Sequence, residues 1–448
     1  MKDKIRFFLF LCLIFGCYFI IFSDCQSLSV IVSFLIIPVM IYFSGKYKKL
    51  TFLLPLSWCL VLLYPVFLVL LDGHTPVVSV FYYFIICGIL SAPLSFFILT
   101  SLSCKYRFVS PFVYVILLYC FKADVFQVLP VIMVFQSDVF RHFVGHSVSP
   151  WVITLALLYF SLSLYEIIIR KYKVSLCYFL TAFLFFLPAG ESRYHYSVKN
   201  VKVAGIQLSR MMGKNTDLND IITYTDDFIL KNPDVKMVVY SESPWLGFKS
   251  YNNQVFTERF IHHLIKRSAE NGVIYIFQVD SLKLNKNYIN KVLTVKAENG
   301  ELWYTGKSHL VPGWERGITD SGGTFSPEKH KMKFRAFGSE FKTLICYDAL
   351  FMPSFFDRDY DVALVQSNYG VFREVAGVRA YNHMIKISNI LSWFSGASNG
   401  KIYINVENEG GSEFFGINGQ MNDGGFFDSS QKKLFTVIMG DAHYHEGG

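Results

Sequence analysis

The chain has 448 residues, of which 52% are hydrophobic, 17% are aromatic and only 17% are charged. This length allows two or three folding units, and the charged fraction falls below the roughly one quarter that is typical of soluble domains. The formal net charge of +8 does not indicate nucleic-acid binding, because much of the positive charge lies in short connectors between apolar runs.

The first part of the chain, to about residue 190, contains apolar runs long enough to cross a bilayer. We expect seven spans in a helical transmembrane bundle, at about 6–22, 28–44, 51–71, 78–103, 108–121, 150–169 and 174–189. Alternate connectors carry the positive charge, namely Lys2, Lys4 and Arg6; Lys46, Lys48 and Lys49; Lys105 and Arg107; and Arg170, Lys171 and Lys173. Lysine and arginine are retained in the cytoplasm. The pattern therefore predicts a cytoplasmic N-terminus and an outer location for everything beyond about Gly190.

One apolar piece, at about 125–136, does not fit this alternation. It is flanked by Asp124 and Asp138 and is short for a span. The connectors on both sides of it have a cytoplasmic composition, so an even number of crossings must separate them. We interpret the piece as a re-entrant or interfacial segment, with a true span as the alternative.

Residues 198–440 have the composition of a globular domain, and 441–448 form a polar tail. Strands are expected at 201–208, 235–241, 273–279, 290–297, 301–305, 331–337, 341–347, 361–367 and 401–406, and helices at 216–230, 254–270 and 374–394. The segments 331–337 and 341–347 have the pattern of a hairpin. This β-α-β succession with hairpins predicts a mixed-sheet α/β or α+β domain.

Three reactive side chains follow predicted strands of this domain. Cys346, the only cysteine of the polar half, lies near the end of the run FKTLICY, Glu242 follows VVYS, and Lys307 follows the strand at 301–305. A thiol becomes a strong nucleophile when a base takes its proton or a cation lowers its pKa, and acyl transfer needs a donor for the oxyanion. A carboxylate, an ammonium and a thiol at strand ends therefore indicate a covalent acyl-transfer site.

These segments resemble the carbon–nitrogen hydrolase (nitrilase) superfamily, with its Glu–Lys–Cys triad. More narrowly, KSHLVPGWE and CYDALF are similar to segments of the apolipoprotein N-acyltransferase family, in which a membrane bundle precedes an extracytoplasmic nitrilase domain. The resemblance implies a four-layer α-β-β-α sandwich. It also implies that Glu242 is the general base, that Lys307 stabilises the oxyanion, that Cys346 carries a thioester, and that Glu315 is the family's second glutamate, which orients the lysine or the nucleophile.

Five further residues are expected to contact substrate, namely Tyr347, Asp348, Trp245, Trp314 and Asn368. Tyr347 follows the nucleophile, and Asp348 stands where the family usually has glutamate. Asn368 lies in Ser-Asn-Tyr-Gly-Val, which departs from the family's S-N-D-x-W and changes the expected acceptor pocket. The two tryptophans lie in the loops of Glu242 and Glu315, where they are either pocket walls or membrane-interface anchors.

The reaction that the resemblance implies moves a fatty acyl chain from phospholipid to the cysteine and then to the α-amino group of a lipoprotein N-terminal cysteine. It requires no cofactor and no metal, and it implies a multi-pass protein of the bacterial inner membrane with its catalytic domain on the periplasmic face. The family usually has one more span after the nitrilase domain, which we do not expect here. Shortened membrane nitrilases of conjugal-transfer systems are similar in this respect. The alternatives are therefore an amidase or acyltransferase with another acceptor, and a non-catalytic membrane scaffold.

Overall fold

The computed structural model describes residues 26–120, 150–186, 201–208, 218–242, 251–279, 282–284, 287–289, 293–311, 327, 333–350, 360–395, 402–408, 411–415, 434–439 and 444–445. The expected span at 6–22 and the piece at 125–136 lie outside these residues. The chain divides into two compact units. The first comprises Met1–Ser192 with Val371–Leu391, and the second comprises Arg193–Gly370 with Ser392–Gly448. We describe each unit by itself, and the domain boundaries expected from the sequence stay predictions.

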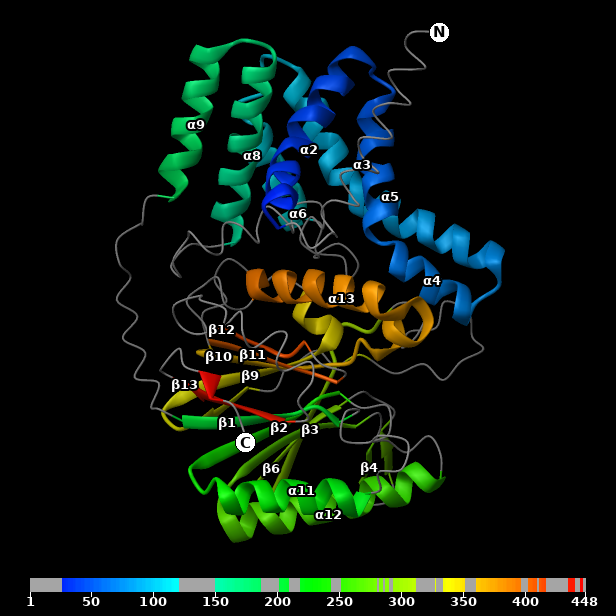
Figure 1. Ribbon diagram of the computed structural model, residues 1–448, viewed down its shortest axis with the longest axis vertical. Coiled ribbons are helices and arrows are strands. Elements are labelled where there is room, and N and C mark those ends of the chain that lie inside the picture. The colour runs from blue at the N-terminus through cyan, green and yellow to red at the C-terminus, as the bar shows by residue number, and fades with distance from the viewer. Residues whose placement is uncertain are drawn as a thin grey trace. The chain divides into compact units, whose positions relative to one another are not determined.

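The first unit is helical (Figure 1). Its described helices are α2 (Gln26–Lys46), α3 (Leu50–Leu62), α4 (Tyr64–Gly73), α5 (Pro76–Leu102), α6 (Ser110–Cys120), α8 (Pro150–Ile168), α9 (Tyr172–Phe186) and most of α13 (Gly370–Ser395). Among the described residues, α5 alone is long and apolar enough to cross a membrane by itself, and α3 and α4 add a second candidate if they count together as one span. The bundle of seven spans therefore stays a prediction.

The expected single span at 51–71 is broken into α3 and α4, which are bent by 65°. The break falls at Leu63, whose φ of −98° and ψ of 18° are not helical. The chain continues with Pro65 in the first turn of α4. Proline lacks the N–H that a continuous helix requires and its ring clashes with the preceding turn, so the break follows from the local sequence.

A buried ion pair ties the α5–α6 turn to α8. The Arg107 guanidinium donates to the Glu166 carboxylate, and its Nε donates to the Ser101 carbonyl oxygen at 2.6 Å. Arg107 and Glu166 are 6% and 0% exposed. A charged group so far from water is stable only when it is paired, so this contact fixes the turn on the helix.

The second unit contains two mixed β-sheets. The larger has the order β14-β13-β1-β2-β3-β6-β7 and the smaller has the order β12-β11-β10-β9-β8. The strands of the larger sheet are β1 (Val201–Ile206), β2 (Val235–Tyr240), β3 (Ile274–Val279), β6 (Leu293–Glu298), β7 (Glu301–Gly306), β13 (Leu434–Met439) and β14 (Tyr444–His445). Those of the smaller are β8 (Lys333–Ala336), β9 (Ser339–Ile345), β10 (Val362–Ser367), β11 (Ile402–Glu407) and β12 (Glu413–Phe415).

The remaining elements are the pair β4 (Leu282–Leu284) and β5 (Asn287–Ile289), the helices α11 (Leu218–Lys231) and α12 (Tyr251–Asn271), and the 3₁₀ turn η2 (Cys346–Leu350). Strands β1, β2 and β3 run parallel, as do β9, β10 and β11. The expected hairpin forms between β8 and β9. Its turn residues, Phe337 and Gly338, have φ of 53° and 85°, as a two-residue hairpin of type I′ requires.

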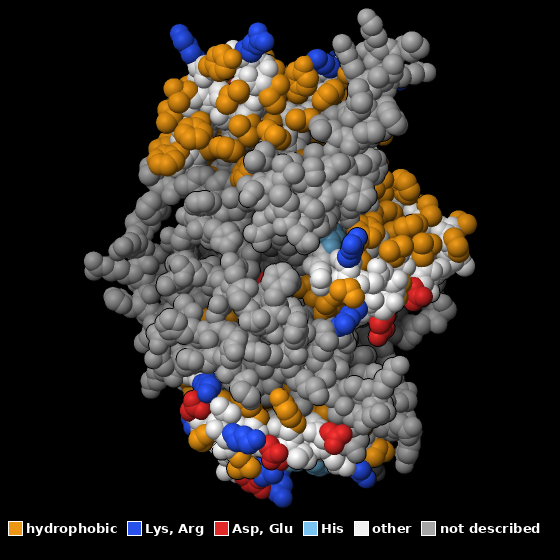
Figure 2. Space-filling view, viewed as in Figure 1, with side chains coloured by type: hydrophobic (Ala, Val, Ile, Leu, Met, Phe, Trp, Pro, Cys, Tyr) orange, Lys and Arg blue, Asp and Glu red, His pale blue; other side chains and the backbone are white. Residues whose placement is uncertain are grey.

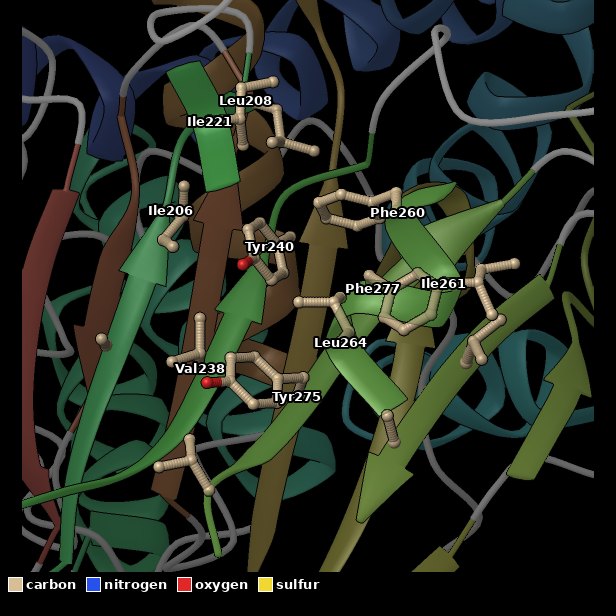
Figure 3. Packing of buried hydrophobic residues seen from close by; sticks show 14 of the residues in the cluster. Ile206, Leu208, Ile221, Val238, Tyr240, Phe260, Ile261, Leu264, Tyr275 and Phe277 are labelled. Atoms are coloured by element: carbon tan, nitrogen blue, oxygen red, sulfur yellow. The ribbon is translucent and has the colours of Figure 1, made fainter. Parts of the chain in front are cut away.

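Helices α11 and α12 cover one face of the larger sheet (Figure 1). Figure 3 shows Phe260 of α12 directed toward Tyr240 of β2 and Phe277 of β3. The ring centroid of Phe260 lies 5.3 Å from that of Tyr240 and 5.6 Å from that of Phe277, and both pairs have edge-to-face geometry. Such aromatic pairs stabilise beyond the burial of their area.

The opposite face of the larger sheet packs on the smaller sheet. This second core contains side chains from β1, β2 and β3 on one side and from β8 to β12 on the other. The second unit therefore has three layers, α-β-β, within the described residues. The helix predicted at 374–394 forms as α13, but its residues 371–391 group with the first unit. The fourth layer of the expected sandwich is thus not among the described elements of the second unit.

Gln366 of β10 joins the two sheets through hydrogen bonds in the apolar core. Its Nε2 donates to the Tyr240 carbonyl oxygen at 2.8 Å, and its Oε1 accepts from the Thr294 hydroxyl at 3.0 Å. Gln366 is 0% exposed. A buried amide is tolerated because both of these contacts satisfy it, and they set the position of β2 relative to β10.

Replacing Gln366→Leu should destabilise the second unit, because the Tyr240 carbonyl and the Thr294 hydroxyl would both lose their partner. We expect a loss of about 2–4 kcal/mol in the free energy of unfolding and a melting temperature lower by several degrees, measured in detergent. Thr294→Val, which removes only the hydroxyl contact, should cost less. Equal melting temperatures for wild type and Gln366→Leu would contradict this assignment.

Candidate active site

Cys346 lies where β9 ends and η2 begins, at the carboxyl end of a strand with parallel neighbours. Its φ is 45°, in the left-handed region that residues other than glycine rarely occupy. Such a conformation costs of order 1–3 kcal/mol and persists only where the surrounding structure imposes it. A strained strand-to-helix turn is also how other folds present a nucleophile at the end of a sheet. Cys346 as a whole residue is 8% exposed, and its thiol is buried.

Glu242 and Lys307 approach each other from two strands of the larger sheet. Glu242 lies two residues beyond β2, and Lys307 follows the last residue of β7. The Lys307 Nζ lies 3.7 Å from the Glu242 Oε1, and the lysine is 1% exposed. An ammonium so deeply buried requires a carboxylate beside it, because the desolvation of an unpaired charge is prohibitive.

Both groups also act on the thiol of Cys346. Burial raises the pKa of Cys346 well above its usual value, and the negative charge of Glu242 raises it further. The Lys307 ammonium and a hydrogen bond from the Asn368 backbone N–H lower the pKa. Since burial dominates, the resting thiol is protonated, with a carboxylate beside it that can accept its proton and a cation that favours the thiolate. The structure thus brings together the three residues that the sequence singled out.

Asp348 connects the segment of Lys307 to the turn of Cys346. Its Oδ1 accepts the His309 backbone N–H at 2.8 Å, its Oδ2 accepts the Ser308 N–H at 3.2 Å, and the His309 Nδ1 lies 2.8 Å from Oδ1. Asp348 is 3% exposed. We expected a substrate contact at this position. The structure shows that the carboxylate has internal partners in the segment after Lys307, and the substrate contact stays a prediction.

Of the other residues expected in the site, the structure describes two. Tyr347 is partly buried beside Cys346 in η2, and Asn368, partly buried, follows β10 with its N–H directed at the sulfur. Glu315, Trp245 and Trp314 lie outside the described residues. Their roles, and the substrate contacts expected of Tyr347 and Asn368, stay predictions.

Hydrogen bonds to the end of β1 and to the segment after β11 hold Ser241, the residue that precedes Glu242. The Ser241 backbone N–H donates to the Ile206 carbonyl oxygen at 2.9 Å, and the Ser241 hydroxyl accepts the Leu208 N–H at 3.0 Å. The same hydroxyl lies 3.4 Å from the Asn408 Oδ1, which belongs to the segment after β11. Contacts with both sheets therefore fix the backbone immediately before Glu242.

A further buried carboxylate, Glu407, was missed by the sequence analysis. It ends β11 and is 1% exposed, and its Oε1 accepts the Tyr369 backbone N–H at 2.8 Å. Its charge also raises the pKa of Cys346. The available signal was an acid at the end of an otherwise apolar predicted strand. Without the strand order, however, nothing indicated that β11 ends near the cysteine.

Histidine pairs do not assemble a metal centre among the described residues, where no group of three or more His, Cys, Asp or Glu has ligand geometry. His263 instead faces Asp226, with 3.3 Å between its Nε2 and the Asp226 Oδ1. Asp226 also accepts from the Arg267 guanidinium. This arrangement is a surface ion-pair network on α11 and α12.

No family model matches the chain, and no curated protein matches its sequence. Solved structures do match, and those named here are all carbon–nitrogen hydrolase or nitrilase superfamily proteins. One from Xanthomonas campestris is 16% identical and has a TM-score of 0.39, with 55% of this chain and 92% of that chain covered. Nit3 of Saccharomyces cerevisiae is 16% identical with a TM-score of 0.36 and coverage of 54% and 90%. A carbon–nitrogen hydrolase from Helicobacter pylori is 15% identical with a TM-score of 0.38 and coverage of 50% and 84%.

The charges around Cys346 predict opposite effects of two substitutions on its reactivity. Glu242→Gln removes a negative charge, lowers the pKa of the thiol and should move the pH profile of iodoacetamide alkylation to lower pH. Lys307→Met removes the cation, raises the pKa and should move the profile to higher pH. The measurement is mass spectrometry of the Cys346 peptide after timed labelling of the full-length protein. Shifts in the same direction would rule out this electrostatic arrangement.

Proposed function

We propose that the protein is a membrane-embedded acyltransferase of the nitrilase superfamily that carries its acyl group as a thioester on Cys346. The observation that carries this proposal is the buried Lys307–Glu242 pair beside a buried thiol at a left-handed strand end. The similarity of KSHLVPGWE and CYDALF to segments of the apolipoprotein N-acyltransferase family points to acyl transfer in particular.

Acylation begins when Glu242 accepts the proton of the Cys346 thiol. The thiolate attacks the ester carbonyl of a phospholipid, and the Lys307 ammonium stabilises the negative charge that develops on the carbonyl oxygen. The carbon–oxygen bond to the glycerol then breaks. The leaving alkoxide takes the proton from Glu242, which releases lysophospholipid and leaves the thioester.

Deacylation repeats these steps with an amine. The α-amino group of a lipoprotein N-terminal cysteine attacks the thioester carbonyl, and Glu242 accepts the proton that the nitrogen loses. The carbon–sulfur bond breaks as the amide forms, and the thiolate recovers the proton from Glu242. If the acyl donor is an amide, whose C–N bond breaks as the thioester forms, and water then takes the place of the acceptor amine, the same site is an amidase. This is the second candidate function, together with transfer to another acceptor.

The exposed surface of the first unit supports membrane embedding. Large hydrophobic side chains are exposed along α5 and α9, and Figure 2 shows hydrophobic side chains gathered on the surface of this unit. They include Val77, Phe81, Phe84, Leu176, Phe179, Leu180, Phe183 and Leu184. Apolar surface of this extent is rare on soluble monomers and is stable against lipid. Both substrates of the proposed reaction reside in the bilayer, which is a reason for a catalytic unit to carry such helices.

A scaffold without activity is disfavoured by the buried charges. Burying Lys307 and Glu242 costs desolvation energy that an apolar pair of the same volume would not. Such a pair beside a strained cysteine is expected where chemistry requires it, since functional sites are where strain and perturbed pKa values gather.

Intact mass spectrometry of the purified protein with phospholipid should detect one fatty acyl chain on Cys346. Cys346→Ala should form no adduct, and Cys346→Ser should form almost none, because a hydroxyl is much harder to deprotonate than a thiol. Glu242→Gln and Lys307→Met should each slow adduct formation by about 10²-fold or more while the protein still folds.

The acceptor is tested by adding a diacylglyceryl-cysteine peptide to the acylated protein. Loss of the adduct with acylation of the peptide amine supports lipoprotein N-acylation. Release of the acyl group only to water, or only to a different amine, would rule out lipoprotein N-acylation and favour the second candidate function. Full biological function in Cys346→Ala, with no adduct from any phospholipid, would establish the scaffold.

The proposed topology makes the second unit extracytoplasmic, because the positively charged connectors of the first unit are retained in the cytoplasm. A reporter that is active only in the periplasm should work when fused after Gly448, and a cytoplasmic reporter at the same place should fail. The opposite pair of results would overturn the topology of seven spans.

A further inference from the structure

The carboxyl ends of β9, β10 and β11 lie side by side, because the three strands are parallel neighbours in the order β11-β10-β9. Cys346 follows β9, Asn368 and Tyr369 follow β10, and Glu407 ends β11. Neighbouring strands are about 4.8 Å apart, so the segment after β10 lies between the thiol and the carboxylate.

Two successive backbone N–H groups of that segment point to different partners. The Asn368 N–H faces the Cys346 thiol, where it lowers the pKa of that thiol, and the Tyr369 N–H donates to the Glu407 Oε1 at 2.8 Å. The backbone of Glu407 is itself fixed, because its N–H donates to the Ser412 hydroxyl at 2.9 Å. An anchored and buried carboxylate therefore determines the orientation of the peptide that presents an N–H to the nucleophile.

We propose that Glu407 is a positioning residue of the Cys346 site: by accepting the Tyr369 N–H it holds the Asn368–Tyr369 segment so that the Asn368 N–H faces the sulfur. This inference rests on the proposed function in one respect, that Cys346 is the nucleophile. Glu407 does not itself contact the reacting atoms. It acts through the backbone of a neighbouring strand end.

Glu407 has two opposing effects on the thiol. Its charge opposes formation of the thiolate, while the hydrogen bond that it anchors favours it. The other charged groups at the thiol are Glu242 after β2 and Lys307 after β7, and Asp348 lies two residues further along η2, paired with His309. Because these groups are unchanged when Glu407 is substituted, variants of Glu407 can separate its charge from its contact.

Two conservative variants separate the effect of the Glu407 charge from that of its hydrogen bond, because they should shift the pH profile of Cys346 alkylation in opposite directions. Glu407→Gln removes the charge and keeps an oxygen that can accept the Tyr369 N–H, so the pH profile of Cys346 alkylation should move to lower pH. Glu407→Asp keeps the charge, but its side chain is one methylene shorter and cannot reach the same N–H. Its profile should therefore move to higher pH than that of wild type, and the rate of alkylation at neutral pH should fall severalfold.

The assay is iodoacetamide labelling of the full-length protein in detergent, followed by mass spectrometry of the Cys346 peptide across a series of pH values. The matched control is Glu413→Gln, because Glu413 is a buried acid of the same sheet and is not among the groups that shift the pKa of Cys346. Its profile should coincide with that of wild type. Melting temperatures of all variants establish that each is folded.

A profile of Glu407→Asp that coincides with that of wild type would overturn the positioning role, because the contact would then have no effect on the sulfur. If the alkylation profile of Glu407→Gln does not move to lower pH, the charge of Glu407 does not oppose formation of the thiolate. The proposed separation of a charge effect from a hydrogen-bond effect would then be wrong. The readout needs no acyl donor or acceptor. Failure of the acyltransferase proposal, seen as the absence of any adduct with phospholipid, is therefore distinguishable from failure of this one.

Discussion

The arrangement of the site depends on one buried ion pair, between the Lys307 ammonium and the Glu242 carboxylate. Neither charge is stable in the interior alone, and the attraction between them offsets desolvation only if the pair is held in close geometry. That requirement constrains the ends of β2 and β7, which are not neighbours in the larger sheet. The pair also explains how a buried thiol can be both protonated at rest and ready to ionise, because a proton acceptor and a cation lie beside it.

The hydrogen bonds between the sheets maintain this geometry. Gln366 links β10 to β2, and Ser241, the residue before Glu242, contacts Asn408 in the segment after β11. Each contact lies in an apolar core, where an unsatisfied polar group would cost of order 1–3 kcal/mol. The two sheets therefore cannot slide without losing several of these contacts. This is how the ends of the smaller sheet, which carries Cys346, stay in place beside those of the larger sheet.

Carboxyl ends of parallel strands provide the polar groups of the site. Cys346 follows β9, and Glu407 ends β11, with the segment of Asn368 between them. Beyond the last residue of β10, the backbone N–H groups of Asn368 and Tyr369 leave the sheet and face Cys346 and Glu407. Asp348 then links the cysteine turn to the segment that follows Lys307, through the backbone N–H groups of Ser308 and His309.

From the sequence alone it was possible to place most strands of the second unit, the hairpin of 331–337 with 341–347 and the three reactive residues, because alternation of apolar residues and strand-end positions are local properties. The position of its turn, at Phe337–Gly338, came from the structure. The break of the expected span at Leu63 also had a local cause in Pro65, but the apolar run concealed it. The hydrogen bonds of Asp348 and Glu407 could not be predicted. Asp348 reaches a residue 39 positions away and Glu407 one 38 positions away, and only the order of strands in the folded sheets brings those segments together.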